Sequence, residues 1–148
     1  MQINKFNIRV YGILINSKQQ VLVCDELIAG RKITKFPGGG LEFGEGTIEC
    51  LKREFMEETN NEVEIISHYY TTDYFQPSLY DASHQIISIY YLVKPVSRFD
   101  VQIKTKPFDF DFSQKEKIAF RWINREELTE AHFTMPIDKI VGARLGKK

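Results

Sequence analysis

Residues 39–61 read GGLEFGEGTIECLKREFMEETNN, and this stretch decides how the rest of the chain is interpreted. It opens on glycines, which have no side chains to pack and tolerate backbone angles that other residues avoid. From Thr47 to about Thr59 the apolar residues recur at helical spacing, with good helix formers between them. Thr47 is expected to cap the start of this helix, and Asn60-Asn61 to end it. The stretch therefore predicts a glycine loop followed by a helix.

The predicted helix carries three carboxylates on one side. With 100° between successive residues, Glu54, Glu57 and Glu58 fall within an arc of about 100°. Like charges at these spacings repel by a few tenths of a kcal/mol per pair, and partial burial beside the apolar face increases the repulsion. A divalent cation would relieve it, and an all-oxygen site favours Mg²⁺ or Mn²⁺ over zinc. On the helix alone, a solvated acidic surface is the alternative interpretation.

The spacing of the charged residues is more specific than the helix alone. It is Gly39-x5-Glu45-x7-Arg53-Glu54-Phe55-x-Glu57-Glu58. This resembles the Nudix box, the signature of the Nudix hydrolases, written G-x5-E-x7-R-E-U-x-E-E-x-G-U with U apolar. Every charged position matches, as does the first apolar one. The resemblance covers most of the chain, because the opening strands, Pro37 before the glycines and a late Trp122 also look like the family.

Two positions depart from the box. Asn60 stands where the family has its late glycine, and Asn61 stands at the last apolar position. Asparagine is the commonest residue other than glycine in the left-handed conformation, so Asn60 is expected to end the helix at modest strain. Val63 is expected to supply the apolar contact that Asn61 cannot. The departures therefore concern the turn and not the carboxylates.

The resemblance implies an activity and a metal site. Nudix hydrolases cleave a nucleoside diphosphate linked to another moiety X, by attack of water on phosphorus. Carried over position by position, Glu54, Glu57 and Glu58 would bind Mg²⁺ or Mn²⁺ and take part in catalysis. The backbone carbonyl of Gly38 would be a further ligand, and Gly39 belongs to the side-chain-free loop that must lie against the helix.

The resemblance also implies roles for residues around the carboxylates. Glu45 and Arg53 would form an ion pair that orients the loop and the helix. Many family members use a glutamate outside the box as an extra metal ligand or general base, and Glu116, six residues before Trp122, is the candidate here. A solvated loop glutamate is the competing interpretation. The less favoured stand-ins are Asp109 and Asp111.

Three kinds of residue are candidates for substrate recognition: basic side chains before the glycines, a proline after the box, and several aromatic residues. Arg31, Lys32 and Lys35 precede the glycines and would meet phosphates, although an ordinary solvated loop explains them equally well. Pro77 lies 16 residues beyond Asn61. That spacing resembles the ADP-ribose pyrophosphatase subgroup, which favours ADP-ribose or a nucleotide sugar as substrate. Several aromatic residues are candidates for stacking on a base, but sheet packing is the favoured interpretation: Tyr69, Tyr70, Tyr74, Phe75 and Tyr80.

The remaining segments predict an α/β (α+β) fold, specifically a Nudix-like α/β/α sandwich with a mixed central sheet. Residues 6–15 and 20–27 read as an opening β-hairpin, and residues 28–35 as a polar connection. The run 85–93 is apolar on both alternating faces, as in a central strand. Short elements follow, namely a strand over 119–123, a helix over 125–131 and a final amphipathic helix over 137–145. Nothing divides the chain, so residues 1–148 are expected to form a single Nudix hydrolase domain.

The charge balance conceals an uneven distribution. The 148 residues include 20 Lys and Arg and 20 Asp and Glu, so the formal net charge is zero. A zero balance argues against a dedicated nucleic-acid binder, which usually has a basic excess. Residues 42–64 hold eight acids and two bases, a local charge of −6, and the rest of the chain carries +6. The acidic segment suits cation binding, and the basic remainder suits a polyanionic substrate.

The cellular setting follows from what the sequence lacks. Cys24 and Cys50 lie in no metal-binding or redox motif, so they are expected to be buried and reduced. The N-terminal segment lacks the apolar core of a signal peptide, and no apolar run approaches the roughly 18 residues of a membrane span. The expected location is the cytoplasm, with a small nucleotide as partner and neither nucleic acid nor membrane. The homodimer common in the family is compatible with the sequence.

Two other classes of function compete with the hydrolase. One is a non-catalytic Nudix-like sensor that binds a nucleotide and regulates a partner. The other is an acidic helix that binds no ligand. Sensors usually carry a degraded box or an added DNA-binding domain, whereas the carboxylates of this box are intact. The hydrolase is therefore the favoured interpretation.

Overall fold

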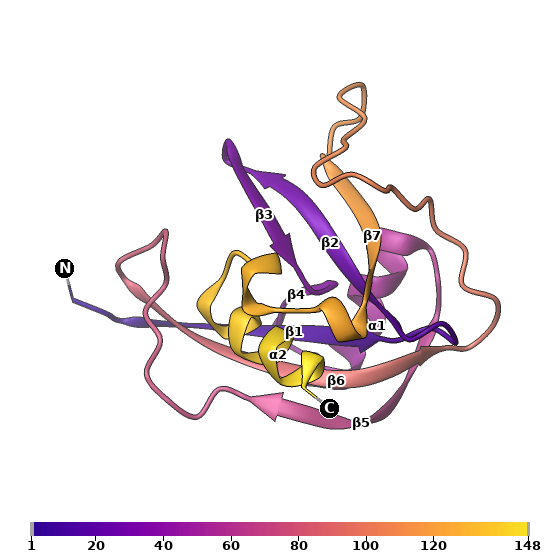
Figure 1. Ribbon diagram of the computed structural model, residues 1–148. Coiled ribbons are helices and arrows are strands. Elements are labelled where there is room, and N and C mark those ends of the chain that lie inside the picture. Colours follow the sequence, from indigo (N-terminus) through magenta and orange to yellow (C-terminus); the bar gives the residue numbers. More distant parts are fainter. Residues whose placement is uncertain (1, 148) are drawn as a thin grey trace. The chain divides into compact units, whose positions relative to one another are not determined.

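The computed structural model describes residues 2–147 and divides the chain into two compact units (Figure 1). Each unit is assembled from two separate segments of sequence. The first combines Met1–Ile13 with Gly38–Phe99, and the second combines Leu14–Pro37 with Asp100–Lys148. Among the described residues, no helix is long and apolar enough to cross a membrane.

The first unit is built on a four-stranded sheet with the order β4-β1-β6-β5. Its helix, α1 (Thr47–Thr59), follows β4 after a short loop and lies behind β1 in Figure 1. The strand β6 lies between β1 and β5, as the apolar run on both of its faces predicts. The strands are β1 (Lys5–Leu14), β4 (Gly38–Gly40), β5 (Val63–Thr71) and β6 (His84–Pro95).

Helix α1 packs directly on β1 because Gly12 leaves room for it. A Cβ placed on Gly12 would lie 2.6 Å from the ring of Phe55, which is almost fully buried. The helix begins at Thr47, and Gly46 is its N-cap residue. The Glu49 carboxylate accepts the Gly46 N–H at 3.0 Å and so stabilises this end of the helix. The expectation that Thr47 is the cap is therefore wrong by one residue; its hydroxyl instead hydrogen-bonds the hydroxyl of Tyr91 at 2.7 Å.

The end of α1 follows the prediction. Asn60 adopts the left-handed conformation, with φ 56° and ψ 29°, and its N–H donates to the carbonyl of Met56. The Asn61 side chain donates back to the Thr59 carbonyl at 2.7 Å, and Val63 is fully buried. Asparagine thus replaces the glycine of the box without breaking the turn.

The second unit is built on a three-stranded antiparallel sheet with the order β3-β2-β7. In its core, the rings of Phe36 and Phe133 stack with their centroids 4.5 Å apart. Cys24 in this unit and Cys50 in the first unit are both free and buried, as expected. The elements are β2 (Gln20–Ile28), β3 (Arg31–Lys35), β7 (Ile118–Asn124), the 3-10 helices η1 (Arg125–Glu127) and η2 (Glu130–His132), and α2 (Pro136–Gly146).

A buried aspartate ties the second unit together. Asp25 on β2 is fully buried, and Arg121 on β7 donates to it from Nε at 2.6 Å and from Nη2 at 2.9 Å. The Thr34 hydroxyl on β3 donates to Asp25 Oδ1 at 2.7 Å, and the Phe108 N–H donates to Oδ2 at 3.1 Å. One carboxylate therefore fixes all three strands and the loop that precedes β7.

The structure confirms the mixed α/β class but corrects three elements. The predicted hairpin over 6–27 is reduced to a turn with one antiparallel bridge, between Ile15 and Val21, because β1 and β2 belong to different sheets. The predicted connection over 28–35 is a tight turn followed by β3, since Ala29 and Gly30 adopt positive φ values of 49° and 78° and reverse the chain at once. The predicted helix over 125–131 consists of two short 3-10 turns, and the final helix is present as α2.

Candidate active site

The glycine strand β4 lies against the carboxylate of Glu54 on α1. Strand β4 pairs antiparallel with β1, with Gly39 opposite Val10, and this face of the sheet carries α1. A Cβ on Gly39 would lie 2.6 Å from the carboxylate carbon of Glu54. Gly38 adopts φ +143°, and a Cβ there would meet the Val10 carbonyl oxygen. Gly39 is therefore required because a side chain would collide with Glu54, and Gly38 because its backbone conformation disfavours other residues.

Arg53 joins the loop before α1 to the helix. Its Nη2 and Nε donate to the two carboxylate oxygens of Glu45, at 2.7 and 3.0 Å, in a bidentate pair. Nη2 also donates to the carbonyl of Gly40 at 3.2 Å, as the thiol of Cys50 does at 3.5 Å. The Glu45 carboxylate in turn accepts the N–H of Glu42 at 3.0 Å. The structure thus brings together the two residues expected to form the ion pair.

The same guanidinium reaches two of the three helix carboxylates. Arg53 Nη1 donates to Glu54 at 3.0 Å and to both oxygens of Glu57 at 3.2 Å, and it lies 3.4 Å from Glu42. Hydrogen bonding to Glu45 is the main cause of the raised pKa of Arg53. One cation therefore offsets the repulsion among the carboxylates around it.

The electrostatics of this cluster shift the pKa of two neighbours. The hydrogen bond from Arg53 lowers the pKa of Glu45 to about 2. Burial raises the pKa of Cys50 to about 12, with its hydrogen bond to Glu45 adding to the effect. Cys50 is therefore a neutral thiol at physiological pH, consistent with a structural role and not a nucleophilic one.

The donor chemistry of α1 fits a divalent cation that prefers oxygen. Glu58 lies on the same helix, and its Oε2 is buried from solvent. Within residues 2–147, no three acidic, His or Cys side chains form a ready-made metal cluster. The reason is visible in the contacts above, since Glu54 and Glu57 are directed at Arg53. Carboxylate oxygens are the type of ligand that Mg²⁺ and Mn²⁺ prefer. To bind such a metal, Glu54 and Glu57 would each have to contact both Arg53 and the metal.

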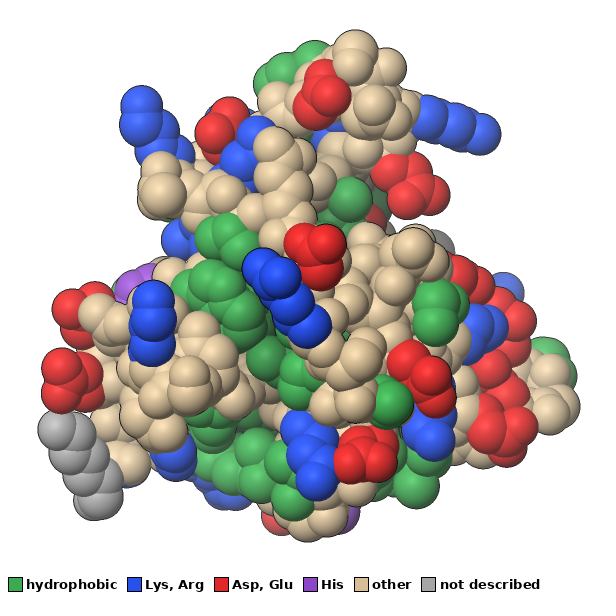
Figure 2. Space-filling view, turned by 90° about the vertical axis from the view of Figure 1, so that its right-hand side faces the viewer, with side chains coloured by type: hydrophobic (Ala, Val, Ile, Leu, Met, Phe, Trp, Pro, Cys, Tyr) green, Lys and Arg blue, Asp and Glu red, His purple; other side chains and the backbone are tan. Residues whose placement is uncertain are grey.

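Acidic side chains gather on the side of the molecule that bears α1. Figure 2 shows them at its right-hand edge, which corresponds to the back of Figure 1, where α1 is drawn. Basic side chains lie among them in the same view. Helix α1 itself lies within residues 42–64, whose local charge is −6.

Comparison with known proteins identifies the family. The chain matches the NUDIX domain over residues 5–143. It belongs to the Nudix family. No curated protein matches it. Similar solved structures include a NUDIX hydrolase from Nitrosomonas europaea, with TM-score 0.68 and 20% identity over 97% of this chain and 92% of that one.

Two further solved structures share the Nudix fold. A MutT protein from Methanosarcina mazei Go1 has TM-score 0.68 and 17% identity over 96% of this chain and 94% of that one. An ADP-ribose pyrophosphatase from Streptococcus suis 89-1591 has TM-score 0.60 and 11% identity over 96% of this chain and 92% of that one. At these identities the likeness establishes the fold alone, while the match over residues 5–143 establishes the family.

Other candidate residues of this Nudix chain lie in the second unit. Glu116 is exposed in the loop before β7. Arg31 and Lys32 are exposed at the start of β3, and Lys32 Nζ lies 5.7 Å from the ring centroid of Phe108. Lys35 is buried, with its Nζ 3.6 Å from Glu26. Of the stand-in acids, Asp109 is exposed, and Asp111 has a lowered pKa because it accepts hydrogen bonds from Ser113.

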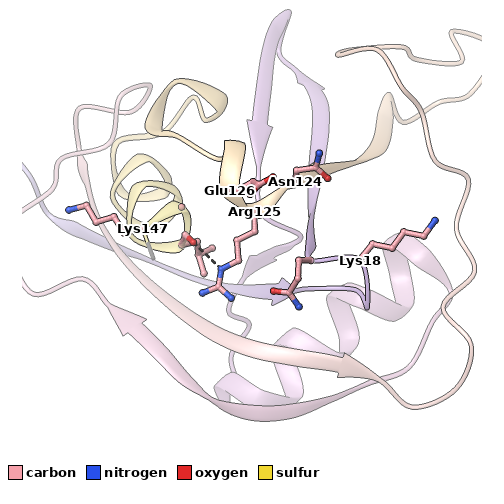
Figure 3. Close-up of a pocket in the computed structure, with 8 residues that line it drawn as sticks. Lys18, Asn124, Arg125, Glu126 and Lys147 are labelled. Atoms are coloured by element: carbon pink, nitrogen blue, oxygen red, sulfur yellow. Dashed lines mark hydrogen bonds between the residues drawn. The ribbon is translucent and has the colours of Figure 1, made fainter.

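A cavity of about 610 Å³ in the second unit holds none of the candidate residues of the Nudix chain. Figure 3 shows Arg125 at its centre, with Lys18 and Lys147 pointing away on either side. Arg125 Nε donates to the carbonyl of Leu145 at 2.9 Å, near the end of α2. A cation there complements the negative end of the helix dipole, so the position of Arg125 is explained by helix capping.

Acid is expected to weaken the Glu45–Arg53 pair of the Nudix box. The pKa of Glu45 is about 2 in the folded chain, against an ordinary value of 4.5. Because the folded value is the lower one, the stabilisation is fully present above about pH 4.5 and is lost as the pH falls towards 2. Urea unfolding between pH 5 and pH 2 should show a steeper loss of stability for the wild type than for Glu45→Gln. An identical pH dependence of the two proteins would contradict this account.

Proposed function

We propose that this Nudix enzyme hydrolyses the pyrophosphate bond of a nucleoside diphosphate linked to another moiety, with Mg²⁺ or Mn²⁺ as cofactor. Family membership supports the coarser reaction, which is pyrophosphate hydrolysis of nucleoside diphosphate derivatives. The observation that carries the finer proposal is the contact between Glu54 and the glycine strand, at 2.6 Å from a Cβ placed on Gly39. It sets a carboxylate of α1 directly beside the backbone of β4, and carboxylate and carbonyl oxygens together are a suitable donor set for a hard cation.

The proposed metal ligands are the three carboxylates of α1 and two groups outside it. The proposed residues are Glu54, Glu57, Glu58, Glu116 and, through its carbonyl, Gly38. When bound, a divalent cation neutralises charge on the phosphate oxygens and lowers the pKa of a water molecule. One of the four glutamates would accept the proton of the attacking water, as a general base within hydrogen-bond reach does.

The chain's own residues would position the reacting groups. Arg53 donates to Glu54 at 3.0 Å and to Glu57 at 3.2 Å, and so orients both carboxylates toward the same guanidinium. Glu45 holds Arg53 through two hydrogen bonds and so links the loop to the helix. Phosphoryl transfer depends chiefly on positioning and charge stabilisation, and a fixed carboxylate cluster serves both.

The proposed substrates are ADP-ribose or a nucleotide sugar. The spacing from Asn61 to Pro77 supports this choice, and an ADP-ribose pyrophosphatase is among the proteins of similar fold. Arg31 and Lys32, which are exposed on β3, are proposed to contact substrate phosphates, with Lys35 as a buried neighbour. We further propose that residues 1–148 act as one Nudix domain.

A substrate panel tests the proposal. Purified protein is incubated with ADP-ribose, nucleotide sugars, dinucleoside polyphosphates and oxidised deoxynucleoside triphosphates, with Mg²⁺, Mn²⁺ or EDTA. We expect cleavage of ADP-ribose or a nucleotide sugar that requires the metal. Turnover of none of these compounds would contradict the proposed reaction. Turnover of only the oxidised triphosphates would contradict the proposed substrate while leaving the reaction standing.

A methyl group at Gly39 should impair catalysis without unfolding the protein. Its Cβ would lie 2.6 Å from the carboxylate of Glu54, so that carboxylate must move away from the strand. A shift of about 1 Å in a catalytic group can cost roughly 100-fold in rate. We therefore expect Gly39→Ala to lose about 10-fold to 100-fold in kcat, with a melting temperature near that of the wild type. Wild-type kcat in this variant would show that the close contact has no catalytic role.

A further inference from the structure

The two faces of β1 have different neighbours. Gly12 faces α1, because a Cβ there would touch the Phe55 ring at 2.6 Å. Side chains alternate along a strand, so Arg9 and Tyr11 point to the opposite face. In the pairing of β1 with β4, Arg9 lies opposite Gly40 and Tyr11 lies opposite Gly38, so these four residues share one face of the sheet. The face away from α1 therefore presents an arginine beside the glycine strand.

Arg9 is held in a defined orientation. Its Nε donates to the hydroxyl of Tyr11 at 3.1 Å, and its Cζ lies 5.9 Å from the centroid of the Tyr11 ring. Tyr11 is itself buried, and its ring lies 5.2 Å from that of Tyr90. The hydrogen bond from Nε fixes the orientation of the guanidinium plane, and a planar guanidinium matches two oxygens of a phosphate.

The absence of side chains on β4 brings this guanidinium close to the carboxylate cluster. A Cβ on Gly40 would lie 3.3 Å from Arg9 Nη1, while one on Gly39 would lie 2.6 Å from Glu54 on the other face. The two charged groups therefore lie on opposite faces of β4, which is the edge strand of its sheet. A polyphosphate lying along this edge strand would meet the proposed metal-binding carboxylates at one face and the guanidinium at the other.

We propose that Arg9, oriented by Tyr11, binds a phosphate of the substrate at the glycine strand. The identity of that anion as a nucleoside diphosphate rests on the proposed function. Arg9 is a positioning and specificity residue in this account, since it contacts phosphate and not the proton-transfer groups. A lone arginine in a strand belongs to no motif, so the sequence does not single out Arg9, and its place beside the glycine strand appears only when β1 and β4 are paired.

Steady-state kinetics with Arg9→Gln test the role in binding. Loss of a charge-assisted bidentate contact should raise KM about 10-fold to 100-fold, with kcat within a few-fold of the wild type. Tyr11→Phe removes only the acceptor that orients Arg9 and should raise KM by a smaller factor. Arg98→Gln removes a charge from an exposed arginine of the same unit and should leave KM unchanged. Equal KM values for Arg9→Gln, Tyr11→Phe and the wild type would overturn the proposal.

A binding measurement separates this inference from the proposed hydrolysis. Calorimetric titration with ADP and with adenosine, both in EDTA, reports phosphate recognition without turnover. We expect wild type to bind ADP more tightly than adenosine, and Arg9→Gln to lose that difference, about 10-fold or more. If the wild type cleaves nothing but Arg9→Gln still weakens ADP binding, the phosphate site stands and the hydrolysis fails. If the wild type cleaves its substrate and Arg9→Gln binds ADP normally, the phosphate site fails and the hydrolysis stands.

Discussion

Replacing Glu57 by Gln is expected to remove most of the metal-dependent hydrolysis while the protein stays folded. Glutamine preserves the volume of the side chain but lacks the negative charge that a metal or a proton-accepting step requires. Loss of such a group costs about 100-fold to 10,000-fold in kcat. The side chain of Glu57 is 56% exposed, and its ion pair with Arg53 lies on the helix surface. Such pairs contribute only about 0.3–0.5 kcal/mol, so the folding stability should barely change.

The matched control for this variant is Glu62→Gln, which removes one exposed carboxylate just beyond α1. Initial rates are measured for both variants on the substrate that the wild type cleaves, across a range of Mg²⁺ concentrations. The control should keep wild-type kcat and the same metal dependence. Wild-type activity in Glu57→Gln would remove this residue from the catalytic site. A loss as large in the control would show that the total charge of the acidic segment, and not Glu57, governs the rate.

Replacing Asp25 by Asn should produce the largest loss of stability. Asp25 is fully buried and accepts hydrogen bonds from Arg121, Thr34 and the Phe108 N–H. An amide offers one acceptor oxygen where the carboxylate offers two, and it leaves the Arg121 charge without its counter-ion. The Arg121 side chain is only 12% exposed. Removing one partner of a buried pair costs about 3–5 kcal/mol.

Urea unfolding checks this expectation against an exposed pair of the same chain. Glu64 lies 3.1 Å from Lys94, with both side chains more than half exposed, so Glu64→Gln should cost less than about 1 kcal/mol. The double variant Asp25→Leu/Arg121→Met removes both buried charges and should recover part of the loss. A cost below about 1 kcal/mol for Asp25→Asn would show that the second unit does not depend on this carboxylate.

The sequence predicted best the features that depend on neighbouring residues. Helix α1 follows from local apolar periodicity, and its end at Asn60 follows from the tolerance of asparagine for the left-handed conformation. The resemblance to the Nudix box implied a contact between Glu45 and Arg53, which the structure shows at 2.7 Å. These features lie within 16 residues of one another, so little depends on the rest of the fold.

The pairing of strands could not be predicted in the same way. Strand β1 pairs with β4, and β2 pairs with β7, about 100 residues further along the chain. Such pairings depend on tertiary packing and leave no local pattern. Asp25 did leave a signal, since it is an acidic residue in the apolar run VLVCDELI. A charge in a buried strand predicts a buried partner, but it does not indicate that the partner is Arg121.

Titration with Mn²⁺ determines whether the carboxylates of α1 bind the catalytic metal. Mn²⁺ binding is followed by electron paramagnetic resonance for the wild type, for Glu54→Gln/Glu58→Gln, and for Glu62→Gln as the control. We expect the wild type and the control to bind Mn²⁺ alike and the double variant to lose at least about 10-fold in affinity. Equal Mn²⁺ affinity in the wild type and the double variant would contradict this expectation.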